Sequence, residues 1–171
     1  MKRYLEIAFV LAACSALYAC ASKAVVPKEK LENVTKVIYR FEDSSVPPAY
    51  HRSYTKEVTG SSSSCVVDSY GEIITHSQYS ETSALLTELR KILKDSRFEA
   101  CYRPAPEGCT GGTGERIHLM VNEEKIFSAE VYHFGGKDYG TFCGGVVANI
   151  NEKMAGIKCK LQREPHNNSL K

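Results

Sequence analysis

The sequence predicts an α+β domain, in which two helices pack on one face of a mostly antiparallel sheet. Several short segments alternate apolar and polar residues, as half-buried strands do. Two longer segments repeat apolar residues at helical spacing, and Gly- or Pro-rich stretches separate the elements. The expected order is β-β-β-α-β-β-α, which suits helices laid on one face of a single small sheet domain.

Three strands are expected before the first helix. Residues 34–42 alternate apolar with charged or smaller side chains, and residues 52–59 repeat this alternation. Residues 65–76 are expected to form one longer strand that bends at Gly71. Residues 43–50 contain a Pro-Pro pair, so we interpret them as a stiff loop between the first two strands.

Residues 80–94 give the clearest helical pattern. Their apolar side chains fall on one stripe: Leu85, Leu86, Leu89, Ile92 and Leu93. Glu81 lies near the positive end of the helix dipole and basic residues lie near its negative end. Residues 146–157 predict a second amphipathic helix, with apolar side chains at Val146, Val147, Ile150, Met154 and Ile157.

Residues 115–121 and 125–134 predict a β-hairpin between the two helices. The register that keeps apolar residues on one face pairs Val121 with Lys125, Leu119 with Phe127, and Ile117 with Ala129. A slip by one residue would scatter these residues over both faces. The same register places His118 on the polar face and His133 on the apolar face.

The first twenty residues have the anatomy of an export signal. Lys2 and Arg3 precede an apolar stretch over residues 5–19, which is shorter than the about 20 residues of a membrane span. Small residues end the stretch. Cys14 and Cys20 both follow a Leu at minus three and an Ala at minus one.

This Leu-x-Ala-Cys pattern resembles the lipobox of bacterial lipoproteins. In that family the cysteine becomes residue one and carries the lipid, so the resemblance implies a membrane anchor. Cys20 is favoured because it leaves an apolar region of ordinary length, while Cys14 has the more usual local letters. Both remain open, as does cleavage without lipidation after Ala21 or Ala24.

The expected organisation and location follow from the choice of Cys20. We expect a signal peptide over residues 1–19, a lipidated N-terminus and tether over 20–32, the domain over 33–161 and a flexible tail over 162–171. The protein is then exported to the bacterial cell envelope, on its periplasmic or surface face. The formal net charge of +2 lacks the basic excess of a nucleic-acid-binding protein, so we expect no such partner.

The cysteines after Cys20 are odd in number: Cys65, Cys101, Cys109, Cys143 and Cys159. Export favours disulfides, and an odd count leaves one thiol free or paired outside the chain. We expect a bridge between Cys109 and Cys143, because each precedes glycines that let backbones approach closely. The alternative pairs Cys101 with Cys109 and Cys143 with Cys159.

The sequence contains three motifs that resemble chemical sites, and we expect none of them to bind a cofactor. Residues 109–114 (CTGGTG) lack the Lys-Ser/Thr pair and the following helix of a phosphate loop. Zinc could be proposed from Cys109, His118, His133 and Cys143, but the two histidines fall on opposite faces of the expected sheet. Cys143 precedes the last helix and His133 is ten residues back, so a thiol hydrolase remains an alternative.

A stiff loop offers the best candidate contact surface. Pro47 and Pro48 hold Tyr50 and Arg52, residue types that are enriched at interfaces. Because no catalytic set is evident, we expect a non-enzymatic binding or structural domain. An inhibitor or immunity protein that blocks a toxin or protease is the alternative from another class.

Overall fold

The structure is a computed structural model, which describes residues 28–80, 83–95, 111–140 and 146–160 together with Pro104 and Glu107. Its strands form one seven-stranded antiparallel sheet. The strands are β1 (Lys36–Glu42), β2 (Ser53–Thr59), β3 (Ser62–Ser69), β4 (Glu72–Ser80), β5 (Thr113–Val121), β6 (Glu124–Phe134) and β7 (Lys137–Gly140). The helices are α2 (Lys28–Glu32), α3 (Ala84–Asp95) and α4 (Val146–Lys153), followed by the 3₁₀ turn η1 (Met154–Gly156). The prediction of a single small domain built mainly on an antiparallel sheet is confirmed.

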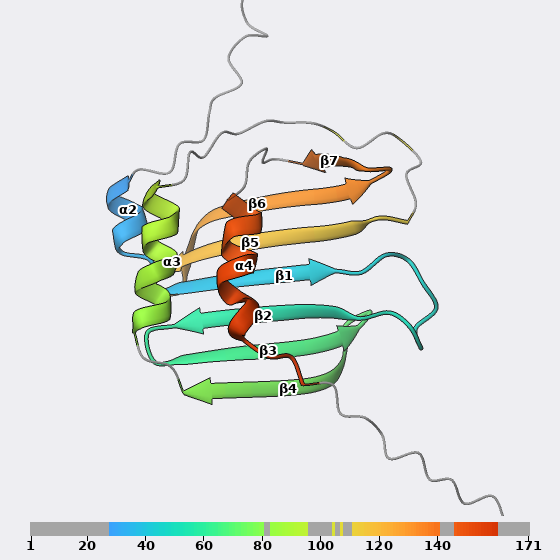
Figure 1. Cartoon of the computed structure of the whole chain (residues 1–171), viewed down its shortest axis with the longest axis horizontal. Helices are drawn as coiled ribbons and strands as arrows, with labels where there is room; N and C mark the ends of the chain where they lie inside the picture. Colours follow the sequence, from blue (N-terminus) through green and yellow to red (C-terminus); the bar gives the residue numbers. More distant parts are fainter. Residues whose placement is uncertain are drawn as a thin grey trace, which may run out of the picture.

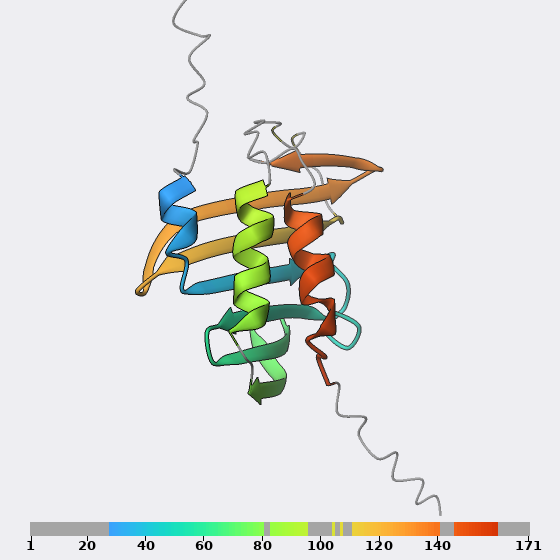
Figure 2. The same ribbon diagram turned by 60° about the vertical axis from the view of Figure 1, so that its left-hand side comes forward.

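Strand β1 lies at the centre of the sheet. The spatial order is β4-β3-β2-β1-β5-β6-β7, so three strands follow β1 outward on one side and three on the other. Helix α3 carries the chain from the edge strand β4 back to β5, which pairs with β1. All three helices lie on the same side of the sheet (Figure 1), and α3 and α4 run beside each other across it (Figure 2).

The structure differs from the expected element order in three places. Residues 65–76 are not one bent strand but belong to two strands, β3 and β4, which are joined at Tyr70 and Gly71. Both residues have positive φ, 50° and 90°, as the tight two-residue turn of a hairpin requires. Strand β7 and helix α2 were not expected. They contain four and five residues, too few to show a period.

Helix α2 also changes where the domain begins. Residues 28–32 fall in the expected tether, yet Leu31 is 1% exposed and belongs to the core. The carbonyl of Val34 accepts a hydrogen bond from Arg90 Nε of α3 at 2.7 Å, and Glu32 pairs with Lys94 of the same helix. The described part of the domain therefore starts at residue 28.

The predicted register of the β5–β6 hairpin is confirmed through most of its length. Leu119 faces Phe127 and Ile117 faces Ala129. A bulge between Leu119 and Met120 shifts the last pairs, so Val121 faces Glu124 and not Lys125. The bulge accommodates a two-residue turn at Asn122 and Glu123, both at positive φ.

The core lies between the helices and the face of the sheet that they cover. Alternate strand residues supply one side of it, among them Val37, Tyr39, Val58, Val67, Ile117, Leu119, Ala129 and Val131. In α3 three residues of the predicted stripe are buried, Leu86, Leu89 and Leu93, while Leu85 and Ile92 are partly buried. All five predicted apolar residues of the last helix are buried: Val146, Val147, Ile150, Met154 and Ile157.

A buried lysine of the sheet binds a backbone carbonyl of the last helical segment. Lys56 of β2 is 7% exposed, and its Nζ donates to the carbonyl oxygen of Met154 at 3.0 Å. The ammonium also lies 5.4 Å from the centre of the Tyr54 ring. Burial lowers the pKa of Lys56. The carbonyls at a helix end are the favourable partner for such a cation.

A disulfide joins Cys65 to Cys159, so the expectation that the cysteines form a disulfide is confirmed. Cys65 lies on β3 and is fully buried, whereas Cys159 follows η1 and is partly buried. This pair shows that the alternative bridge from Cys143 to Cys159 is wrong, since Cys159 is already bonded. The expected bridge between Cys109 and Cys143 lies outside the described residues, as does Cys101.

Candidate functional site

The loop that the sequence singled out as a contact surface is closed by hydrogen bonds at both ends. The carboxylate of Asp43 accepts from the backbone N–H of Ser44 at 2.8 Å and of Arg52 at 2.9 Å. The backbone N–H of Asp43 donates to Ser53 Oγ at 3.0 Å. The carbonyl of Pro47 accepts hydrogen bonds from the backbone N–H groups three and four residues further along the chain. The loop is therefore a defined structure, not a slack connection.

A second set of contacts ties this loop to the turn between β3 and β4. Ser69 Oγ donates to the carbonyl of Pro48 at 2.9 Å, and the hydroxyl of Tyr70 donates to the carbonyl of Val46 at 2.5 Å. The ring of Tyr70 stacks on that of His51, with centroids 3.9 Å apart. Two segments about twenty residues apart in sequence thus form one surface.

The side chain of His51 is buried beneath this contact. It is 5% exposed, and its Nδ1 accepts a hydrogen bond from the backbone N–H of Tyr70 at 3.3 Å. Nε2 lies 3.4 Å from Ser53 Oγ. A backbone N–H can only donate, so Nδ1 is the acceptor in the contact with Tyr70. His51 therefore holds the Tyr70 backbone from below while its ring supports the Tyr70 ring.

Large apolar side chains are exposed on and beside this surface. Tyr50 is 75% exposed, Tyr70 55% and Ile73 66%, and both prolines of the loop are exposed. We call Pro47, Pro48, Tyr50, Tyr70 and Ile73 the contact patch. The sequence singled out the first three, whereas Tyr70 and Ile73 join them only in the structure, because nothing in their sequence neighbourhood marks them as partners of the loop.

Arg52, the fourth predicted contact residue, is turned partly into the loop. Its Nη1 donates to the carbonyl of His51 at 2.6 Å and to that of Pro48 at 3.4 Å. The side chain is of intermediate exposure. The guanidinium of Arg52 thus stabilises the loop by binding its carbonyls. The aromatic and proline side chains provide the outward surface.

The face of the sheet opposite the helices carries a ladder of paired charges. Arg40 of β1 binds Asp68 of β3 through two nitrogens, at 2.8 and 3.3 Å, and reaches over Thr55 of β2 to do so. Asp68 also accepts from the backbone N–H of Gly71. The hydrogen bond from Arg40 is the main cause that lowers the pKa of Asp68, against burial, which raises it.

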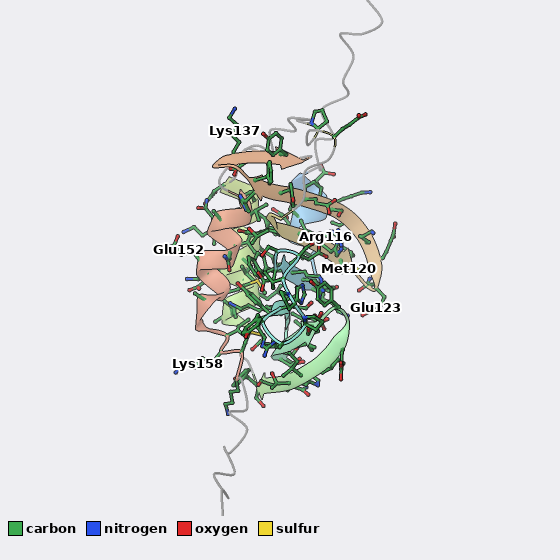
Figure 3. The ribbon with its side chains drawn as sticks, turned by 90° about the vertical axis from the view of Figure 1, so that its right-hand side faces the viewer. Arg116, Met120, Glu123, Lys137, Glu152 and Lys158 are labelled. Carbon is green, nitrogen blue, oxygen red and sulfur yellow. A yellow bond between two sulfur atoms is a disulfide. The ribbon has the colours of Figure 1, made fainter. Side chains whose placement is uncertain are left out.

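The ladder continues on the other side of β1. Arg116 of β5 lies opposite Arg40 and pairs with Glu130 of β6 and Glu42 of β1. Figure 3 shows Arg116 and Met120 on the side of the sheet turned away from α4, while Glu152 lies with α4. Both guanidinium groups are engaged with carboxylates. This row therefore holds neighbouring strands together and does not present a free positive charge.

The two histidines weighed for a metal site lie on opposite faces, as the register predicted. His118 faces Ser128 on the open face, where its Nδ1 is buried and has no hydrogen-bond partner among the described residues. Burial is the main cause that lowers the pKa of His118, followed by Lys125 and Arg116. Within the part of the chain that the structure describes, no group of His, Cys, Asp and Glu side chains could hold a metal ion.

His133 is held between two carboxylates on the helix-facing side. Asp138 Oδ1 lies 2.8 Å from Nδ1, and Glu115 Oε1 lies 3.2 Å from Nε2. Both ring nitrogens are therefore within hydrogen-bond distance of a carboxylate. Cys143, the expected nucleophile of the hydrolase alternative, lies outside the described residues.

A buried tyrosine lies in the same region. Tyr39 is fully buried, and its hydroxyl has no hydrogen-bond partner among the described residues. Burial raises its pKa, with smaller contributions from Tyr54 and Glu115. The ring packs against that of Tyr54, with centroids 6.1 Å apart. Its position within the hydrophobic core is that of a packing residue.

Cys20, the expected lipid anchor, lies outside the described residues. Among the helices that the structure does describe, none has the length and apolar character to cross a membrane. No protein-family model matches this chain, and no curated protein or solved structure resembles it significantly.

Proposed function

We propose that this chain is a lipid-anchored bacterial envelope protein whose domain binds another protein through the contact patch. The export-type N-terminus supports the address, with Cys20 as the anchor. The patch supports the activity: three large apolar side chains face solvent on a surface that hydrogen bonds hold in one conformation. Exposed apolar clusters of this kind mark interaction sites.

Tyr70 is the single observation that carries this proposal. A tyrosine with φ of 50° is strained, and glycine or asparagine would fill the turn at lower cost. Strained residues persist where the surrounding structure holds them, and they cluster at functional sites. Here the strain presents an aromatic ring to solvent. Tyrosine is also a residue type that dominates binding energy at interfaces.

A rigid patch lowers the cost of binding. The loop is closed by Asp43 and fastened to the β3–β4 turn through Ser69 and Tyr70, so little backbone entropy remains to be lost in a complex. Neither Tyr50 nor Ile73 carries charge, so we expect the partner to present an apolar depression that receives these side chains. The proposed role is recognition without turnover.

Cross-linking from inside the patch tests this role. A photoreactive phenylalanine analogue is placed at Tyr50 of the full chain, which is expressed in the cells that naturally produce it. The analogue should capture one defined protein of the envelope. Substitution of Tyr70→Ala should abolish the capture, while Lys137→Ala on the opposite sheet edge should leave it unchanged. Capture that survives Tyr70→Ala, or specific turnover of a peptide, ester or glycan by the pure protein, would overturn the proposal.

The address has its own test. The mass of the mature N-terminus should show a lipid-modified Cys20. Cys20→Ser should release the protein from the membrane fraction, and Cys14→Ser should not. If Cys14→Ser alone releases it, the anchor is Cys14. An unmodified N-terminus at Ala21 or beyond would remove the lipid from the proposal and leave the binding role in place.

A further inference from the structure

The two edges of the sheet are protected to very different degrees. At one edge β7 has four residues, begins with Lys137 and continues with Asp138. It pairs only with residues 131–134 of β6, and the first part of β6, which has no described strand on its outer side, carries Glu124, Lys125 and Glu130. At the other edge β4 has nine residues and contains no lysine, arginine or proline. Native proteins shield sheet edges with short strands, charges and proline, because an open edge pairs readily with another strand. By these criteria the β7 edge is shielded, whereas β4 carries a single charged residue, Glu72, at its start and is open beyond it.

The two faces of β4 are also largely uncovered in the described structure. Its residues are exposed or half-buried with the exception of Thr75, and Ile73 and Ile74 are 66% and 37% exposed. No described strand lies on its outer side. Such a strand has a row of backbone donors and acceptors available for a ladder of hydrogen bonds.

We propose that β4 pairs with β4 of a second copy of this chain, antiparallel across a two-fold axis. Residues 75–80 (THSQYS) carry no fixed charge, so every antiparallel pairing of this segment with itself avoids opposed like charges. A polypeptide strand is always complementary to its own backbone in this arrangement. The two sheets become one, and its helices stay on a common face.

This pairing also limits itself to two copies. A two-fold contact uses the same surface on both protomers, so both β4 edges are consumed. The outer edges of the joined sheet are then the two short, charged β7 strands together with residues 124–130 of β6, which carry three charged side chains. An assembly that consumes its open edges does not grow into a filament. In a dimer the open β4 edge is covered and the charged β7 edge stops further growth, whereas in a monomer the open β4 edge stays uncovered.

The dimer is expected to be weak in solution. One pair of nine-residue strands buries less than the about 1,200–2,000 Å² of a standard stable interface. We therefore expect a dissociation constant in the micromolar range. The pairing uses the outer backbone of β4, and of the contact patch only Ile73 lies on that strand, so substitutions at Tyr50 and Tyr70 separate partner binding from dimerisation.

Sedimentation equilibrium of the full chain in density-matched detergent, over micromolar concentrations, tests the proposal. The unsubstituted chain should dimerise, and Gln78→Lys should weaken the dimer by about tenfold or more, because it adds a lysine to each of the two paired edge strands. Ser128→Lys, the same kind of change at an exposed position of β6, should have no effect. A chain that stays monomeric, or a dimer that tolerates Gln78→Lys, would overturn it.

Hydrogen exchange of the unsubstituted chain gives a second measurement that needs no variant. Protection of β4 amides should rise with protein concentration, while protection of β7 amides should not. Protection of β4 that is independent of concentration would mean that the chain covers its own edge, and the dimer would be wrong. Tyr70→Ala, which should abolish capture by the probe at position 50, should leave the dimer intact, so loss of partner capture with retention of the dimer separates this proposal from the binding role.

Discussion

Tyr70 decides the local path of the chain through contacts that lie far away in sequence. Its positive φ costs an L-residue about 1–2 kcal/mol, and its stacking on His51 and hydrogen bond to Val46 offset that cost. Turn chemistry selects glycine or asparagine at such positions, so the sequence indicated only a bend at Gly71. A turn that depends on a distant ring contact leaves no local signal.

Substitutions at Tyr70 should reverse the usual order of alanine and glycine. Tyr70→Ala loses the stacking and the hydrogen bond while it keeps the strained backbone, and should lower the free energy of unfolding by about 1–2 kcal/mol. Tyr70→Gly loses the same contacts but relieves the strain, so it should be about 1 kcal/mol more stable than Tyr70→Ala. Urea unfolding measures both. Equal stabilities, or a less stable glycine variant, would show that the turn is not strained.

At the scale of elements, the strength of the pattern decides what the sequence predicts. The β5–β6 hairpin was predicted in register because a period of two leaves a single apolar face, marked by Ile117 and Leu119. The break between β3 and β4 was missed because β4 is an edge strand, whose mostly exposed side chains follow no apolar alternation. The contact loop was found from its prolines and Tyr50, while Tyr70 joined it through tertiary structure.

The pairing of Arg40 with Asp68 connects β1 to β3 across β2. Asp68→Asn should lower the free energy of unfolding by about 2 kcal/mol at neutral pH, because Asp68 is nearly buried while Arg40 is partly exposed and keeps Glu42. The pKa of Asp68 is lowered by folding, so its contribution is complete at neutral pH. It declines once the pH falls below the usual range of an aspartate and the unfolded state takes up the proton first.

Urea unfolding of both proteins from neutral to acidic pH measures this contribution. The difference in stability between the unsubstituted chain and Asp68→Asn should be largest at neutral pH and should shrink as the solution is acidified. Ser64→Asn on the same strand and face is a matched control, and its offset should not vary with pH. A difference that stays constant with pH would show that the charge of Asp68 is not what Arg40 requires.

Over the whole molecule, the Cys65–Cys159 disulfide connects β3 to the segment that follows the last helix. The two residues are 94 positions apart, so no spacing rule relates them. The sequence favoured pairs near glycines, yet the fold places Cys159 beside the buried Cys65 after α4 has crossed the sheet. Lys56 binds the carbonyl of Met154 in the same segment. The end of the domain is thus fastened to the sheet twice.

Removal of this disulfide should be the most destabilising of the changes considered. A closed loop of this length gives roughly 4–5 kcal/mol by chain entropy, and measured losses for native disulfides are about 2–5 kcal/mol. The paired substitution Cys65→Ala with Cys159→Ala should therefore lower the free energy of unfolding by about 2–5 kcal/mol in urea without reductant. Reduction of the unsubstituted chain should produce a loss at least as large, because it opens the same loop together with the expected bridge between Cys109 and Cys143. If the substituted chain unfolds at the same urea concentration as the oxidised native chain, the bond does not constrain the domain, and the packing around Met154 and Lys56 must hold this segment by itself.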